Sequence, residues 1–287
     1  PVGRPIFMIG KFLGVLGSLL VACMIMTLVF MLVEMHAVIQ TVRDPIHVPV
    51  VVFGIGGAVL TAAAAVWCNY FYGMSFTSTA LILALPVLAV SYGVSLNFDA
   101  EFAQQDLGLS FKGNLWLAVA ALTTCVAMLA AIAVTVSTRL GQLMTLAATI
   151  GLFVLGLLSD WIFGRSIRGM ESEWLARASE KGLVESVEVV DSIHRTTGEI
   201  TENMTTVERA TVPLTEMANT SELLGWSLMN IGYAMLPNFQ ILWLSDAVTQ
   251  GVSIPSDYLI KSMTYGILYA AAAVCVGIVL FQRRDLG

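Results

Sequence analysis

Residues 12–35 read FLGVLGSLLVACMIMTLVFMLVEM, and this stretch carries no charged side chain before Glu34. An α-helix rises about 1.5 Å per residue, so about 20 apolar residues cross a hydrocarbon core about 30 Å thick. Lipid offers no hydrogen-bonding partners to the backbone, so an apolar run of this kind is helical when it crosses a bilayer. The stretch therefore predicts a membrane-spanning α-helix.

The rest of the chain repeats this pattern. Of its 287 residues, 57% are hydrophobic and only 12% are charged, and the mean hydropathy is +0.83. Soluble domains carry about 25% charged residues, so a free-standing soluble enzyme is excluded. We predict an all-α, polytopic α-helical membrane protein with about six transmembrane helices. The other five apolar runs are 49–71, 77–98, 114–137, 142–163 and 259–281.

The distribution of lysine and arginine predicts the orientation. Cytoplasmic loops are enriched in these residues, and one side of the expected bundle collects most of them. The opposite side receives the loops 36–48 and 99–112. We therefore expect both ends of this chain to be cytoplasmic. The residues on the cytoplasmic side are Arg4, Lys11, Arg139, Arg283 and Arg284.

The long polar stretch 164–257 separates the fifth expected span from the sixth. It carries thirteen acidic side chains against six basic ones, and long translocated segments largely escape the positive-inside rule. We divide the chain into 1–163 with five spans, an acidic extracytoplasmic helical insertion at 164–257, and 258–287 with the last span and the tail.

Two amphipathic helices are expected to form a cap within 165–222. Leu183, Val187 and Val190 recur at helical spacing, as do Ile200, Met204 and Val207 after a break at 196–198. Residues 223–244 are apolar but are interrupted by Pro237. A full crossing there would put the tail on the wrong side, so we expect an interfacial or re-entrant segment held by Trp226 and Trp243.

A search for catalytic chemistry finds no constellation to support it. The sequence contains no HExxH, GxSxG or GxxxxGK[ST] pattern, and its histidines and cysteines lack ligand spacing. The glycines at 54–57 lie inside a span, where small residues let helices approach closely. Asp160 lies near a span end, and we favour structural anchoring there over a substrate role. We predict no catalytic, cofactor-binding or metal-binding residue, and the net charge of −6 predicts no nucleic-acid partner.

Five short motifs resemble those of exporter-type (type-2) ABC transporter permeases, in the branch associated with multicopper-enzyme maturation. Each motif flanks a helix, and their order along the chain matches the family. The motifs are PVGRPIFMIGKFLG at 1–14, STRL at 137–140, LGLLSD at 155–160, LPNFQ at 236–240 and FQRRDL at 281–286. Family members carry further N-terminal spans before the first motif. The resemblance implies that these spans are absent from this sequence, and that the 49–98 pair is an extra hairpin.

The resemblance also implies a location in a bacterial inner membrane, and a mechanism. A separate ATP-binding cassette subunit would hydrolyse ATP in the cytoplasm, and two permease chains, identical or different, would form the path through the bilayer. Arg4, Lys11 and Arg139 would be the nearest coupling contacts, with topology anchoring as the alternative role for each. A non-transporting membrane scaffold that retains the permease fold stays open as a second hypothesis, with an extracytoplasmic protein docked on the 165–222 cap.

Overall fold

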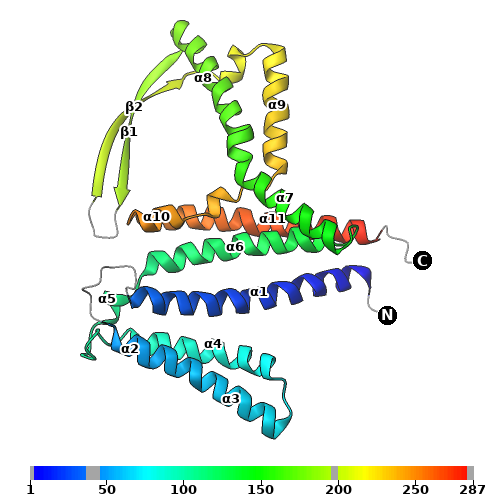
Figure 1. Ribbon diagram of the computed structural model, residues 1–287. Helices are drawn as coiled ribbons and strands as arrows, with labels where there is room; N and C mark the ends of the chain where they lie inside the picture. The colour runs from blue at the N-terminus through cyan, green and yellow to red at the C-terminus, as the bar shows by residue number, and fades with distance from the viewer. Residues whose placement is uncertain (1–2, 37–45, 195–199, 283–287) are drawn as a thin grey trace. The chain divides into compact units, whose positions relative to one another are not determined.

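The structure is a computed structural model that describes residues 3–36, 46–194 and 200–282 (Figure 1). Among these residues, six helices are long and apolar enough to cross a membrane. The prediction of an all-α polytopic membrane protein is therefore confirmed, and the chain is an integral membrane protein. The six are α1 Arg4–Met35, α2–η1–α3 Val48–Tyr72, α4 Phe76–Ser95, α6 Gly113–Val136, α7–η2–α8 Gln142–Glu180 and α11 Ser256–Gln282.

The chain divides into two compact units, and the boundary falls within α1. Unit 2 is Gly14–Gly113, and unit 1 combines Pro1–Leu13 with Asn114–Gly287. Each unit has its own buried residues, so the two are described separately.

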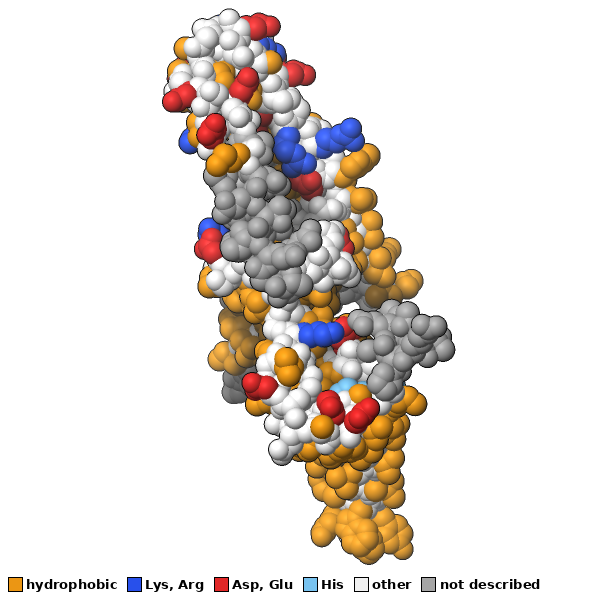
Figure 2. Space-filling view, turned by 90° about the vertical axis from the view of Figure 1, so that its left-hand side faces the viewer, with side chains coloured by type: hydrophobic (Ala, Val, Ile, Leu, Met, Phe, Trp, Pro, Cys, Tyr) orange, Lys and Arg blue, Asp and Glu red, His pale blue; other side chains and the backbone are white. Residues whose placement is uncertain are grey.

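Unit 2 contains a helical hairpin. The shorter helices of this unit are α2 Val48–Val50, the π-helical η1 Val51–Ile55, α3 Gly56–Tyr72 and α5 Leu107–Ser110. Helix α3 ends at Tyr72 and is followed by Gly73, whose φ of 66° is left-handed and typical of a glycine after a helix terminus. A β-carbon on Gly57 would lie 2.5 Å from Ser91 Oγ, so only glycine lets α3 and α4 approach this closely. Hydrophobic side chains cover the visible surface of this hairpin (Figure 2).

Unit 1 is organised around α6. Helix α6 has the largest buried share of the six helices, and α11 packs along it. Thr135 Oγ1 donates a 2.7 Å hydrogen bond to the carbonyl oxygen of Ala273. A β-carbon on Gly266 would lie 2.6 Å from Thr124 Cγ2, so the two helices meet through small residues.

The fifth apolar helix does not stop where its apolar sequence stops. Helix α7 Gln142–Ser159 continues through the π-helical η2 Asp160–Gly164 into α8 Arg165–Glu180, which gives 39 residues without a break. The expected domain boundary at 163–164 therefore lies inside one helix.

The expected pair of amphipathic helices after residue 180 is wrong. Strands β1 Val184–His194 and β2 Ile200–Ala210 form an antiparallel hairpin instead, with Val187 opposite Val207 and Val190 opposite Met204. Val184, Val187 and Val189 are β-branched and favour a strand, and the pairing with 200–210 determines the structure, which the spacing of three and four within one segment does not report. The expected break at 196–198 lies outside the described residues.

The insertion then returns to helix. The short 3₁₀ helix η3 Leu214–Met217 precedes α9 Thr220–Met235, which begins with a capping box between Asn219 and Glu222. Residues 236–239 form a turn that leads into η4 Gln240–Leu242 and α10 Ser245–Thr249. The interfacial position expected for 223–244 stays a prediction, and α9 is not one of the six candidate spans.

Candidate functional site

The three cationic residues selected from the sequence converge at one end of unit 1. Arg4 Nη1 donates to the carbonyl oxygen of Gln282 at 2.7 Å, and Arg139 Nη2 donates to that of Leu280 at 2.8 Å. Lys11 Nζ donates to Ser137 Oγ at 2.9 Å. We call Arg4, Lys11 and Arg139 the basic cluster.

The unpaired carbonyl groups at the C-terminal end of a helix explain two of these contacts. The last four carbonyl groups of an α-helix have no partner within the helix, and the helix dipole is negative at that end. The guanidinium groups of Arg4 and Arg139 bond to two such carbonyls of α11. They therefore neutralise its C-terminal end and fasten it to α1 and α6.

Apolar contacts reinforce the same junction. The rings of Phe7 and Phe281 stack with their centroids 5.8 Å apart. Met8 is buried, and a β-carbon on Gly277 would lie 2.6 Å from its methyl carbon. The ends of α1, α6 and α11 are thus joined by both polar and apolar contacts.

The basic cluster keeps its charges accessible. Arg4, Lys11 and Arg139 are all exposed residues. Within residues 3–36, 46–194 and 200–282, none of the three forms an ion pair with a carboxylate. Three exposed cations close together attract an anionic surface. Arg283 and Arg284 lie outside the described residues.

A second group of contacts surrounds Asp160, where α7 passes into α8. Arg168 donates two hydrogen bonds of 2.9 Å to the Asp160 carboxylate. Tyr233 Oη lies 3.5 Å from Asp160 Oδ1 and accepts a 2.8 Å hydrogen bond from Asn238 Nδ2. The backbone N–H of Asn238 donates to Tyr265 Oη at 2.9 Å. These five residues, which we call the polar joint, connect α7, α8, α9 and α11.

Two glycines allow the helices at the polar joint to pack closely. A β-carbon on Gly164 would overlap the Asp160 carboxylate, and one on Gly156 would overlap the Pro237 carbonyl oxygen and lie 2.6 Å from the ring of Phe239. The position of Asp160 fits the anchoring role favoured from the sequence. Sequence analysis missed Arg168, because the span was expected to end before it.

Helices α8 and α9 are held together further along by a clamp of Trp174, Arg177, Glu222 and Trp226. Arg177 donates two hydrogen bonds of 2.8 Å to the Glu222 carboxylate, and Trp174 Nε1 donates a third at 3.2 Å. Trp174 is fully buried, and its ring centroid lies 6.0 Å from that of Trp226.

The electrostatics of the clamp favour the ionised form of its carboxyl group. The Arg177 hydrogen bonds, followed by the N–H of Asn219, lower the pKa of Glu222 from 4.5 to about 2. Sequence analysis missed the clamp, although the Asn219-x-x-Glu222 capping pattern was a readable signal.

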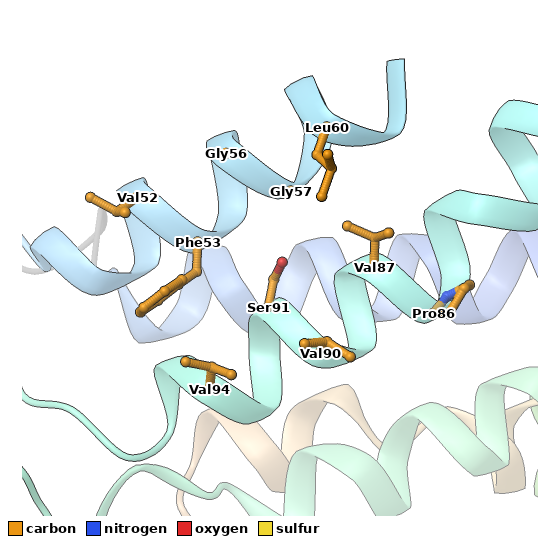
Figure 3. A pocket seen from close by; sticks show the side chains of 10 residues that line it. All are labelled: Val52, Phe53, Gly56, Gly57, Leu60, Pro86, Val87, Val90, Ser91 and Val94. Atoms are coloured by element: carbon orange, nitrogen blue, oxygen red, sulfur yellow. The ribbon is translucent and has the colours of Figure 1, made fainter. Parts of the chain in front are cut away.

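An apolar groove of about 420 Å³ lies between η1–α3 and α4 in unit 2 (Figure 3). Ser91 is the single lining residue with a polar side chain, and its hydroxyl points towards Gly57. The groove can accommodate an apolar chain, but it offers no charged group to orient a polar substrate. Its other lining residues are Val52, Phe53, Gly56, Leu60, Pro86, Val87, Val90 and Val94.

Across the described part of the chain, no group of three or more His, Cys, Asp or Glu residues is placed to hold a metal ion. In comparisons with known proteins, no protein-family model, curated protein or solved structure matches this chain. The architecture of the described residues is that of an integral membrane protein, with six long apolar helices and a charged insertion.

Proposed function

We propose that the chain is the transmembrane permease subunit of an ABC transporter, coupled to a separate ATP-hydrolysing subunit. The observation that supports this proposal is the arrangement of the five motifs that resemble the family. The motifs at 1–14 and 137–140 contain the basic cluster and Ser137, Gln282 in the described part of the last motif accepts the hydrogen bond of Arg4, and 155–160 packs on 236–240. Motifs far apart in the sequence thus form two contact groups within unit 1.

The basic cluster suits a coupling role because it joins three helix ends. Arg4 and Arg139 hold the terminus of α11 against α1 and α6, while Lys11 bonds to the turn after α6. A motor subunit that pushes on this end would displace the three helices together. Exposed cations there would attract acidic side chains of such a partner.

In this proposal the basic cluster faces the cytoplasm of a bacterial cell, together with both ends of the chain. Two permease chains form the path through the inner membrane. The motor subunits bind and hydrolyse ATP, and their closing and opening switch the accessibility of the path. The insertion lies outside the membrane and offers a surface for an extracytoplasmic protein at 165–222.

A second candidate function is a membrane scaffold without transport. The hairpin of β1 and β2 favours it, because eleven residue pairs join two strands and the described residues supply no third strand. An isolated two-stranded hairpin is marginally stable in water, so a docked partner would stabilise it. The scaffold would use the acidic insertion as its docking surface and would bind no motor subunit.

The test is purification of the tagged full-length protein from its native membrane in mild detergent. We expect a stoichiometric protein with a nucleotide-binding cassette and vanadate-sensitive ATP hydrolysis that is lost when the two proteins are separated. Absence of any such protein would overturn the proposal and support the scaffold.

A matched pair of variants tests the coupling surface. Lys11→Gln removes a charge of the basic cluster, whereas Lys261→Gln removes an exposed charge from the other end of α11, where Lys261 pairs with Asp257. We expect Lys11→Gln to weaken retention of the motor subunit about threefold to tenfold, which corresponds to about 0.7–1.4 kcal/mol. Lys261→Gln should leave retention unchanged. Equal retention for both variants would exclude Lys11 from the coupling surface.

A further inference from the structure

A cavity of about 470 Å³ opens in unit 1 between α7 and the segment that holds η4 and α10. Leu157 and Leu158 form its apolar side, and Leu158 is an exposed residue. Three residues with polar groups, Gln240, Trp243 and Asp246, line the rest. Ligand sites in proteins combine apolar walls with a few polar groups, in cavities of about 300–1,000 Å³.

The polar groups of this cavity have almost no partners in the protein. Within the described residues, no hydrogen bond is made by the side-chain amide of Gln240 or by the indole N–H of Trp243. The Asp246 carboxylate accepts one long hydrogen bond of 3.3 Å, from the neighbouring Ser245 hydroxyl, and no described cation pairs with it. An anionic acceptor and two kinds of N–H donor are therefore free for a ligand.

The cavity also lies near the end of the apolar run at 142–163. Leu157 and Leu158 precede Ser159 and Asp160, the apolar run continues through Phe163 in η2, and further charged residues follow in α8. Tryptophan is enriched at the headgroup level of bilayers, and Trp243 is about half exposed. The apolar side of the cavity is thus continuous with the lipid-facing surface of a spanning helix, and the polar side lies at its edge.

We infer that this cavity binds a phospholipid with a primary-amine headgroup. The ammonium group would bond to the Asp246 carboxylate and lie against the indole face of Trp243, an arrangement that combines a charge-assisted hydrogen bond with a cation–π contact. The phosphate oxygens would accept hydrogen bonds from the Trp243 indole N–H and the Gln240 amide. One acyl chain would lie along Leu157 and Leu158. An anionic headgroup without an amine would place negative charge near Asp246.

This site does not depend on coupling to an ATPase, so it is tested on the purified chain alone. The probes are dioleoyl phosphatidylethanolamine and dioleoyl phosphatidylglycerol, added separately to the full-length protein in detergent and measured by native mass spectrometry. We expect one bound phosphatidylethanolamine per chain, retained about fivefold better than phosphatidylglycerol. Equal retention of both lipids would overturn the assignment.

Two variants and one control locate the site. Asp246→Asn is nearly isosteric at an exposed position and should reduce the preference for the amine lipid about fivefold, and Trp243→Leu should do so while it keeps the apolar surface. The control Asp257→Asn removes an exposed carboxylate outside the cavity and should have no effect. An unchanged preference in Asp246→Asn, or an equal loss in Asp257→Asn, would contradict the inference.

A final arm separates a lipid from a soluble amine. Soluble phosphoethanolamine carries the same headgroup without acyl chains, and at equal concentration it should not displace the bound lipid. Complete displacement would assign the cavity to a soluble amine and overturn the lipid assignment.

Discussion

Because Gly156 has no side chain, α7 can pack closely against the turn before η4. A β-carbon there would overlap the Pro237 carbonyl oxygen and crowd the buried ring of Phe239. Gly151 lies in the same helix, and a β-carbon there would meet nothing within 4 Å. The two glycines therefore differ in surroundings while they share a helix.

We predict opposite outcomes for alanine at these positions. Gly156→Ala should destabilise the protein by about 1–3 kcal/mol, because overpacking outweighs the gain in helix propensity. Gly151→Ala should leave the Tm unchanged or raise it. Thermal unfolding in detergent, followed by circular dichroism, measures both. Equal Tm values for the two variants would show that α7 and the turn are not in tight contact.

Glu222 makes the clamp sensitive to acid. Its folded pKa of about 2 lies below its ordinary value of 4.5, so the ionised carboxylate stabilises the folded state. This contribution is complete above pH 4.5 and is lost as the pH falls from 4.5 to about 2. Glu222→Gln keeps a side chain that can cap α9 and removes the charge.

The difference in Tm between the natural protein and Glu222→Gln should therefore be constant at neutral pH and should vanish as the pH approaches 2. Melting curves at several pH values test this, with Glu216→Gln as a control at an acidic residue that makes no ion pair within the described chain. A difference that persists unchanged at the acid end of the series would show that the variant acts through something other than the carboxylate charge.

Several of these contacts could not be predicted from the sequence, and the reason is distance along the chain. Arg177 and Glu222 are 45 residues apart, and the Asp160–Arg168 pair depends on the helix continuing through η2. The basic cluster was easier to predict, because the positive-inside rule assigns cations to one side of the membrane without knowledge of their hydrogen-bond partners. The helix carbonyls that bind Arg4 and Arg139 carry no signal in the side-chain sequence.

At the scale of elements, hydrophobic length predicted the helices of the membrane region well. Each apolar run of about 20 residues became a helix, because lipid leaves the backbone no other economical structure. The segment 184–210 was misassigned because water permits both structures and cross-strand pairing decides between them. The pairing of Val187 with Val207 is a long-range contact that periodicity within one strand does not report.

The polar joint links the insertion to the apolar helices, in addition to the continuous helix from α7 to α8. Tyr233→Phe removes the hydroxyl group that lies between Asp160 and Asn238, and it leaves the Asn238 amide without its acceptor. We expect a cost of about 1–3 kcal/mol and a looser junction between α8 and α11. Spin labels attached at Ala176→Cys and Ile267→Cys should then show a broader distance distribution by double electron–electron resonance spectroscopy.

Two controls separate a loosened joint from general unfolding. Labels at Ala176→Cys and Leu228→Cys lie on α8 and α9, and their distribution should stay unchanged because the clamp holds these helices. Tyr258→Phe removes a hydroxyl group that bonds to Ile241 outside the joint, and it should not broaden the Ala176–Ile267 distribution. An unchanged distribution in Tyr233→Phe would mean that helix continuity alone orients the insertion.

At the scale of the whole molecule, the orientation in the membrane connects the proposals. The coupling role needs the basic cluster in the cytoplasm, and the docking role of the insertion needs residues 165–222 outside. Six crossings, one for each long apolar helix among the described residues, would place both ends of this chain on one side, and α7 would then lead from the cluster end to the insertion. Gln142 begins α7 and Ser172 lies beyond η2 in α8, and both are exposed.

Gln142→Cys and Ser172→Cys, introduced separately into a chain whose four native cysteines are replaced, report on the two sides. In intact cells a membrane-impermeant maleimide should label Ser172→Cys and leave Gln142→Cys unlabelled. Both positions should react after the membrane is permeabilised, which shows that each thiol is accessible. The reverse pattern would put the basic cluster outside, and a cytoplasmic motor subunit could then not reach it. Labelling of both positions in intact cells would mean that α7 does not cross the bilayer.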